Sequence, residues 1–210
     1  MMRAYSEVYL EQAQYSLGSM LDHAVNDLSF GIDEFFTYFC VSGVAKSFGS
    51  GDCRYLAGMS GVELAAVVLE RTGLENRVRA PIVRLDRSQE FWTGWVLAYY
   101  QWWSMLSFEE IVLQMKPSAL IRLYNPYHEM DITHIVRELD AVCRKATRLG
   151  NRRTLLGLSQ SQLAKASGVP VRTIQEYEQR ARSINKAQAD TVAALAKALG
   201  TECANLLENI

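Results

Sequence analysis

The sequence predicts a mainly α-helical protein with two domains. Apolar residues recur at spacings of three and four through most of the 210-residue chain, which is the period of a helix that buries one face. Only residues 75–87 alternate polar and apolar side chains, and we interpret them as an extended linker, because a single strand without a partner is not stable. The length is enough for two modest domains, each with its own core.

Charge divides the chain in the same way. Residues 1–140 contain 11 Lys/Arg and 18 Asp/Glu, for a net charge of −7, whereas residues 141–210 contain 11 and 5, for a net charge of +6. We therefore predict an acidic α-helical domain at 1–140 and a separate basic domain at 141–210. A basic module joined to an acidic body is typical of a nucleic-acid-binding domain that is fused to a domain with another role.

Three helices are predicted before the linker. The first, at about residues 6–28, keeps its apolar side chains on one face. Asp33 is expected to cap the second, which carries a run of phenylalanines and ends at residues 49–51. Ser60 and Glu63 form a capping-box pair at the start of the third.

Further helices are predicted after the linker. Ser88 caps an aromatic helix, and two short helices follow at about 107–115 and 117–124. The sequence Asn-Pro-Tyr at 125–127 predicts a turn. A last helix, from about Asp131, is expected to lead into the C-terminal domain.

The aromatic helix has the most suggestive surface outside the C-terminal domain. We expect its aromatic side chains to share one broad face, and the simplest interpretation of such a face is the core of the domain. It could instead bind a small-molecule effector or a partner protein, because Trp and Tyr are favoured at binding sites. The residues of this candidate face are Trp92, Trp95, Tyr99, Trp102 and Trp103.

Several classes of protein are disfavoured. The four cysteines are widely spaced, which predicts neither a zinc knuckle nor a disulfide framework. The N-terminus lacks the apolar core of a signal peptide, and the apolar run at 91–106 is shorter than the ~20 residues of a membrane span. We expect a cytoplasmic protein without a membrane partner.

No catalytic or metal site is predicted, and we expect no cofactor. His128 and His134 lie near two carboxylates, but their spacing differs from H-E-x-x-H and does not place both rings on one helix face. Paired carboxylates such as Asp33-Glu34 lie at predicted helix starts, where the helix dipole accounts for them. The sequence therefore does not predict an enzyme.

The strongest local pattern is at residues 158–178. Ser159 is a good N-cap for a short helix, and Gly168 can take the left-handed conformation that ends it. A second helix is predicted from about Pro170. Apolar side chains should meet inside the corner and polar ones should point outward, which is a helix-turn-helix layout. The predicted corner residues are Leu163, Val169 and Ile174.

The string L-S-Q-x-x-L-A-x-x-x-G-V-x-x-x-T-I-x-x-x-E within this stretch resembles the helix-turn-helix domain of phage repressors and Cro proteins, the XRE family. The resemblance extends over about residues 145–208, a third of the chain. It implies a lambda-repressor-like domain of five short helices that binds double-stranded DNA. In such domains the second helix of the motif lies in the major groove, and its N-terminal residues reach the bases.

The resemblance also implies roles for particular residues. Those at base-reading positions are Val171, Arg172, Gln175 and Glu176. Arg172 can donate two hydrogen bonds to guanine, and Gln175 can pair with adenine. Gln160, at the start of the first helix, matches a glutamine that contacts a phosphate, and Thr173 would lie at the groove wall.

The resemblance also implies an ion pair that stabilises the domain and does not contact DNA. Arg153 and Glu178 match a buried ion pair that ties the preceding helix to the end of the reading helix. The chain departs from the family after Glu178, where Gln179-Arg180-Ala181-Arg182 replaces the usual Asn-Gly turn. Its charges suit phosphate contacts by Arg180, Arg182 and Lys186, with Lys186 near an expected helix cap at Asn185.

We therefore expect a sequence-specific transcriptional regulator, acting as a repressor and as a homodimer, since one module reads half of a site. Leu206, Leu207 and Ile210, or the N-terminal domain, could form the dimer interface. The alternative is an antitoxin, whose N-terminal domain neutralises a toxin protein and whose C-terminal domain autoregulates the operon.

Overall fold

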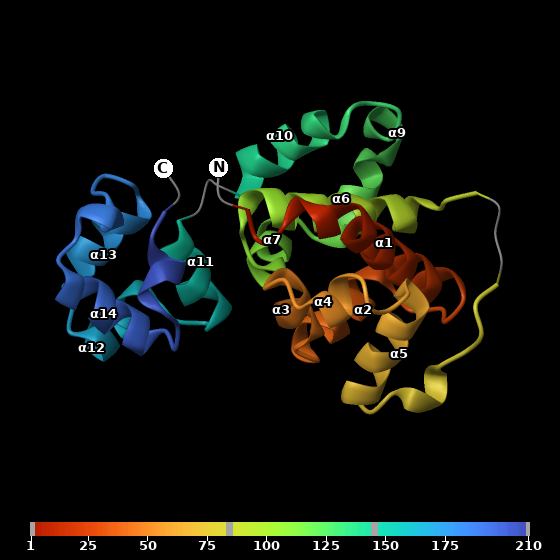
Figure 1. Cartoon of the computed structure of the whole chain (residues 1–210). Coiled ribbons are helices and arrows are strands. Elements are labelled where there is room, and N and C mark those ends of the chain that lie inside the picture. The colour runs from red at the N-terminus through yellow and green to blue at the C-terminus, as the bar shows by residue number, and fades with distance from the viewer. Residues whose placement is uncertain (1–2, 83–85, 144–146, 209–210) are drawn as a thin grey trace. The chain divides into compact units, whose positions relative to one another are not determined.

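The computed structural model describes residues 3–82, 86–143 and 147–208, and within these ranges the chain forms helices and no strands (Figure 1). This confirms the predicted fold class. The chain divides into two compact units, Met1–Val142 and Cys143–Ile210, which are described separately below.

The N-terminal unit begins with η1 (Glu7–Tyr9, a 3-10 helix like the other η elements) and the long helix α1 (Leu10–Asn26). The remaining elements before the linker are α2 (Ile32–Val41), α3 (Val44–Gly49), α4 (Cys53–Leu56), α5 (Gly61–Arg71) and η2 (Glu75–Arg77). After it come α6 (Gln89–Ser104), α7 (Phe108–Gln114), α8 (Pro117–Leu120), η3 (Ile121–Leu123), α9 (Tyr124–Tyr127) and α10 (Ile132–Cys143).

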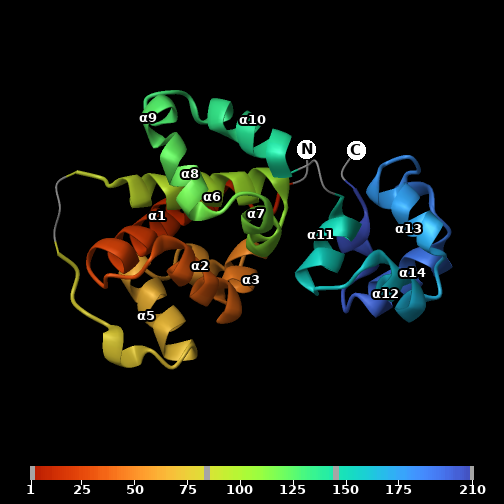
Figure 2. The ribbon, with the colours of Figure 1, turned by 180° about the vertical axis from the view of Figure 1, so that it is seen from behind.

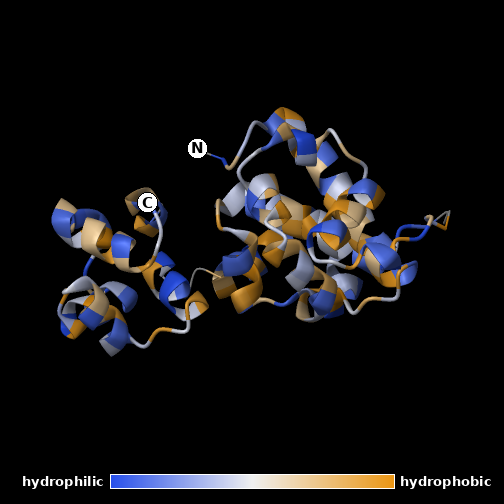
Figure 3. Ribbon diagram, turned by 90° about the horizontal axis from the view of Figure 1, so that it is seen from below, coloured by the Kyte–Doolittle hydropathy of each residue, from blue (hydrophilic) through white to orange (hydrophobic). Residues whose placement is uncertain are grey.

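Helices α1 and α6 form the centre of this unit, and glycines allow their backbones to touch. A Cβ atom added to Gly94 would lie 2.5 Å from the carbonyl oxygen of Leu17, and one added to Gly18 would lie 2.8 Å from that of Phe91. Gly61 lets the start of α5 approach α1 in the same way. Orange, hydrophobic stretches of ribbon lie toward the centre of this unit in Figure 3. The side chains of Leu17, Val96 and Leu97 are fully buried.

A second part of this core consists of phenylalanines from three helices. Phe36 and Phe39 of α2, Phe48 of α3 and Phe108 of α7 meet edge to face, with ring centroids 5.3–6.2 Å apart. Such pairs add to the apolar burial that holds the helices together.

Two predicted boundaries are wrong. The second predicted helix is divided into α2 and α3 at Gly43, which has a left-handed φ of 76°. Asp33 does not cap α2, since the cap is Gly31, whose N–H donates to Glu34. The Asp33 carboxylate instead accepts hydrogen bonds from the Ser118 N–H and hydroxyl, at 2.8 and 2.5 Å, and so ties α2 to α8.

The predicted turn at 125–127 is also wrong, because these residues lie in α9. Pro126 falls within the first turn of this helix, where a backbone N–H has no helical partner and none is lost. The capping box of α5, by contrast, forms as predicted, and Ser107 and Glu110 form a second one at the start of α7. Of the predicted linker, residues 78–82 follow η2 without regular structure, whereas 83–85 lie outside the described residues.

The aromatic side chains of α6 differ in burial. Phe91 and Trp102 are buried, whereas Trp92, Trp95, Tyr99 and Trp103 are half-buried. Of the predicted aromatic face, Trp102 is therefore covered by the protein itself, and the other four residues are partly covered. Helices α9 and α10 lie on the same side of α6 in both views (Figure 1 and Figure 2). Trp92 packs edge-on against Tyr124 of α9, and Tyr100 donates a hydrogen bond to Asp140 of α10.

The C-terminal unit contains α11 (Arg148–Leu155), α12 (Gln160–Ser167), α13 (Val171–Glu178), η4 (Ile184–Lys186), α14 (Ala189–Ala198) and η5 (Cys203–Leu206). The expected five helices thus correspond to four α-helices and a terminal 3-10 turn, with a further 3-10 turn at η4. The core residues are Leu149, Leu163, Val169, Ile174, Tyr177, Ile184, Val192, Leu195, Ala196, Leu199 and Leu206.

Two expectations for the end of this unit change. Leu206 is fully buried in the unit's own core, so it is not available for a dimer interface, while Leu207 is exposed and Ile210 lies outside the described residues. Asn185 is not a helix cap. Its side chain exchanges two hydrogen bonds with the backbone of Glu208, at 2.7 and 2.8 Å, and fastens the C-terminal segment to the loop after α13.

Candidate nucleic-acid interface

The helix-turn-helix corner is formed by local hydrogen bonds that the sequence supplies. The Ser159 hydroxyl accepts from the Gln162 N–H at 3.1 Å, and the Gln162 side chain accepts from the Ser159 N–H at 2.7 Å, which together make a capping box. Gly168 ends α12 with a left-handed φ of 72°. Pro170 then stands at the N-cap of α13.

The two helices of the motif are held at their angle by the side chains inside the corner. Leu163 and Ile174 are fully buried, and Val169 is 7% exposed. These are the three residues predicted for the inside of the corner. Because their packing fixes the crossing of α12 and α13, it also fixes the direction in which the outer face of α13 points.

The outer face of α13 carries the polar residues at predicted base-reading positions. The Arg172 side chain is 89% exposed, whereas Val171, Gln175 and Glu176 are half-buried. The Nε of Arg172 donates to Glu176 Oε1 at 3.2 Å, one helical turn later. Thr173 is also half-buried. An exposed arginine at the start of a helix is a donor that can reach base edges in a major groove.

A chain of polar side chains connects the two helices of the motif. Gln175 Nε2 donates to Gln160 Oε1 at 3.4 Å, and Gln160 Nε2 donates to Glu178 at 2.8 Å. Gln160 is thus held at the N-terminus of α12, where backbone N–H groups and the helix dipole favour an anion. Each glutamine side chain ends in an NH2 group with two hydrogens, so Gln160 and Gln175 each keep one N–H that these two bonds do not use.

The same carboxylate is paired with Arg153 of α11. Nε and Nη2 of Arg153 donate to the two oxygens of Glu178 at 2.7 and 2.9 Å, and Nη1 donates to the Leu158 carbonyl oxygen at 2.7 Å. The pKa of Arg153 is raised above its ordinary value, chiefly because the guanidinium donates hydrogen bonds to Glu178. With side chains only 18% and 10% exposed, the pair is largely shielded from water.

The loop after α13 carries three exposed basic side chains, those of Arg180, Arg182 and Lys186. Arg180 adopts a left-handed φ of 57° where a glycine would be unstrained, and its side chain lies 3.8 Å from Glu208. The Arg182 guanidinium lies over the Tyr177 ring at 5.6 Å. Two other arginines are engaged elsewhere, since Arg148 and Arg152 donate to carbonyl oxygens near the C-terminus of the unit.

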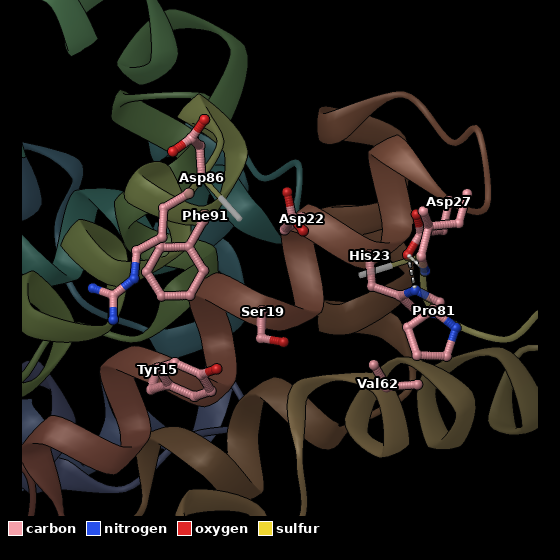
Figure 4. Close-up of a pocket in the computed structure, with 11 residues that line it drawn as sticks. Tyr15, Ser19, Asp22, His23, Asp27, Val62, Pro81, Asp86 and Phe91 are labelled. Carbon is pink, nitrogen blue, oxygen red and sulfur yellow. Dashed lines mark hydrogen bonds and ion pairs between the residues drawn. The ribbon is translucent and has the colours of Figure 1, made fainter. Parts of the chain in front are cut away.

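The N-terminal unit contains a separate feature, a cavity of about 300 Å³ that sequence reasoning missed (Figure 4). At its wall, His23 Nδ1 and Asp27 Oδ2 are 2.7 Å apart, and both side chains are 97% buried. The signal in the sequence was the i,i+4 spacing of His23, in the last turn of α1, and Asp27, just after its end. Its lining residues are Tyr15, Ser19, Asp22, His23, Asp27, Val62, Pro81, Ile82, Asp86, Arg87 and Phe91.

This cavity has mixed charge, with three carboxylates and a guanidinium that stacks on Phe91 at 4.8 Å. In the part of the chain that the structure describes, no group of three or more His, Cys, Asp or Glu side chains is arranged to hold a metal ion.

Comparison with known protein families gives one match, in the C-terminal unit. Residues 149–206 match the model of the helix-turn-helix family of XRE type. This part of the chain is similar to helix-turn-helix domains, which bind DNA in transcription regulators. The match runs from the second residue of α11 to the last residue of η5.

The N-terminal unit is not matched by that family. No curated protein and no solved structure matched the chain. Among the described residues, no helix is both long and apolar enough to cross a membrane.

Proposed function

We propose that the protein is a sequence-specific transcriptional regulator that represses as a homodimer on double-stranded DNA. The observation that supports this best is the outer face of α13, where Arg172 projects from a helix whose direction is fixed by the packed corner beneath it. Arg172 would bind guanine and Gln175 adenine. Val171 and Glu176 lie at the other two predicted base-reading positions of α13.

Phosphate contacts would come from the sides of this face. Gln160 is oriented by Glu178 at the N-terminus of α12, and Thr173 is half-buried on α13. Arg180, Arg182 and Lys186 would add binding that does not depend on sequence and weakens with salt. A dimer would double these contacts on a two-fold symmetric site.

The test is selection of duplexes from a randomised pool by the full-length protein. A sequence-specific dimer enriches an inverted repeat with a conserved guanine, and its affinity for that repeat falls steeply as salt rises. A pool that stays random after several rounds, with binding that depends on salt alone, would exclude sequence-specific recognition. Enrichment of a single half-site would exclude the dimer.

The second candidate is an antitoxin, favoured by the half-buried aromatic face of α6. Trp92, Trp95, Tyr99 and Trp103 form this face, with Trp102 buried beside it, and large aromatic residues contribute strongly to protein interfaces. A toxin protein bound there would leave the C-terminal unit to autoregulate the operon. The cavity near His23 instead favours a regulator that senses a small-molecule effector.

Purification of the whole protein from its own cells distinguishes the antitoxin from the regulator that senses an effector. A stoichiometric protein partner that is lost on substitution Trp95→Ala supports the antitoxin. A bound metabolite, or release of DNA on addition of one, supports the effector-dependent regulator.

A further inference from the structure

We infer that Glu176 is a positioning residue that directs Arg172 to guanine, and that it does not itself read a base. This inference rests on the proposed DNA-binding function. It assigns different roles to two residues that occupy neighbouring base-facing positions on α13.

The first support is the atom through which the two side chains meet. Arg172 uses Nε to donate to Glu176 Oε1 at 3.2 Å, and within the described residues it makes no other hydrogen bond. Nη1 and Nη2, at the far end of the guanidinium, therefore keep their hydrogens for a ligand. Guanine presents the two acceptors O6 and N7 in the major groove, a spacing that two parallel N–H groups of arginine match.

The second support is the difference in exposure. The side chain of Arg172 is 89% exposed and that of Glu176 only 36%, so the carboxylate stays close to the helix while the guanidinium extends beyond it. Arginine is also the longer side chain. The residue that reaches a base first is thus Arg172, with Glu176 behind it.

The third support is electrostatic. A lone carboxylate at a DNA surface is repelled by phosphates and by the acceptor atoms of guanine, and among major-groove groups it is matched mainly by the N4 amino group of cytosine. Pairing with Arg172 offsets that repulsion. It also restricts the rotamers of a flexible side chain, so less entropy is lost when the two bonds to guanine form.

The experiment measures base preference at the arginine-read position with duplexes that differ only there. We expect wild-type protein to prefer guanine over adenine roughly tenfold, and Glu176→Ala to reduce this to less than about threefold. The same variant should bind a duplex without the guanine slightly more tightly than wild type, because a negative charge is removed near the phosphates. Glu176→Gln keeps an oxygen acceptor for Nε and should retain most of the preference.

Glu202→Ala is the matched control, because it removes one exposed carboxylate from the same unit outside the motif. It should leave the guanine preference unchanged, and all variants should melt within a few degrees of wild type.

Two results would overturn the inference. In one, Glu176→Ala keeps the guanine preference. In the other, it relaxes preference at a neighbouring cytosine and not at the guanine, which would make Glu176 a base-reading residue. If wild-type protein shows no base preference at any position, the proposed function itself fails, and the inference fails with it.

Discussion

Arg153 and Glu178 form a two-point ion pair, at 2.7 and 2.9 Å, that ties α11 to the last residue of α13. Gln160 donates to the same carboxylate at 2.8 Å, so Glu178 joins three helices. Because both charges are mostly shielded from water, each depends on the other for its stabilisation.

Glu178→Ala is therefore expected to destabilise the C-terminal unit by roughly 3–5 kcal/mol, since it leaves the Arg153 guanidinium unpaired. DNA binding should be lost because the unit unfolds. All four tryptophans lie on α6, so tryptophan fluorescence reports the N-terminal unit while circular dichroism reports both. We expect helical signal to be lost at a lower temperature with an unchanged fluorescence transition. A native melting curve for this variant would show that the pair is not needed.

Arg180→Gly should stabilise the same unit while weakening its contact with DNA. The left-handed φ of 57° is strained for arginine, and glycine relieves that strain by about 0.5–1 kcal/mol after its greater entropy loss is included. The lost charge should reduce the slope of log affinity against log salt concentration by about 1, the value for one phosphate contact. Arg182→Gly removes an equal charge without the backbone relief, so it should not raise the melting temperature. A lower melting temperature for Arg180→Gly would contradict the strain argument.

Gly94→Ala should destabilise the N-terminal unit by roughly 1–3 kcal/mol, since the added methyl group would lie 2.5 Å from the Leu17 carbonyl oxygen and force α1 and α6 apart. The tryptophan fluorescence transition measures this directly. Gly31→Ala is the control, because its added Cβ meets its nearest neighbour at an ordinary 3.7 Å. An equal loss of stability in both variants would mean that the close approach of α1 and α6 at Gly94 is not important for stability.

The C-terminal unit could be predicted from sequence because its signals are local. Ser159 and Gly168 determine the ends of α12 within a few residues of themselves, and Leu163 and Ile174 follow helical spacing. The position of Asn185 could not be predicted, since its partner Glu208 is distant in the sequence.

The N-terminal unit was predicted less completely for the same physical reason. Gly94 has no distinguishing local pattern, and its importance depends on which residue of α1 it meets. Aromatic spacing likewise could not tell which of Trp92 and Trp102 is buried, because α6 is covered on several sides. The cavity beside His23 required α1, α5 and the end of the linker to be placed together.

The most direct test of the central claim compares wild-type protein with Arg172→Ala on the selected duplex and on a scrambled duplex of the same composition. Wild type should prefer the selected duplex by at least about tenfold. Arg172→Ala should bind both duplexes equally, weakly and in a salt-dependent way, with an unchanged melting temperature because the side chain is 89% exposed. If the variant keeps the wild-type preference, α13 does not read DNA through Arg172, and this account of recognition is wrong.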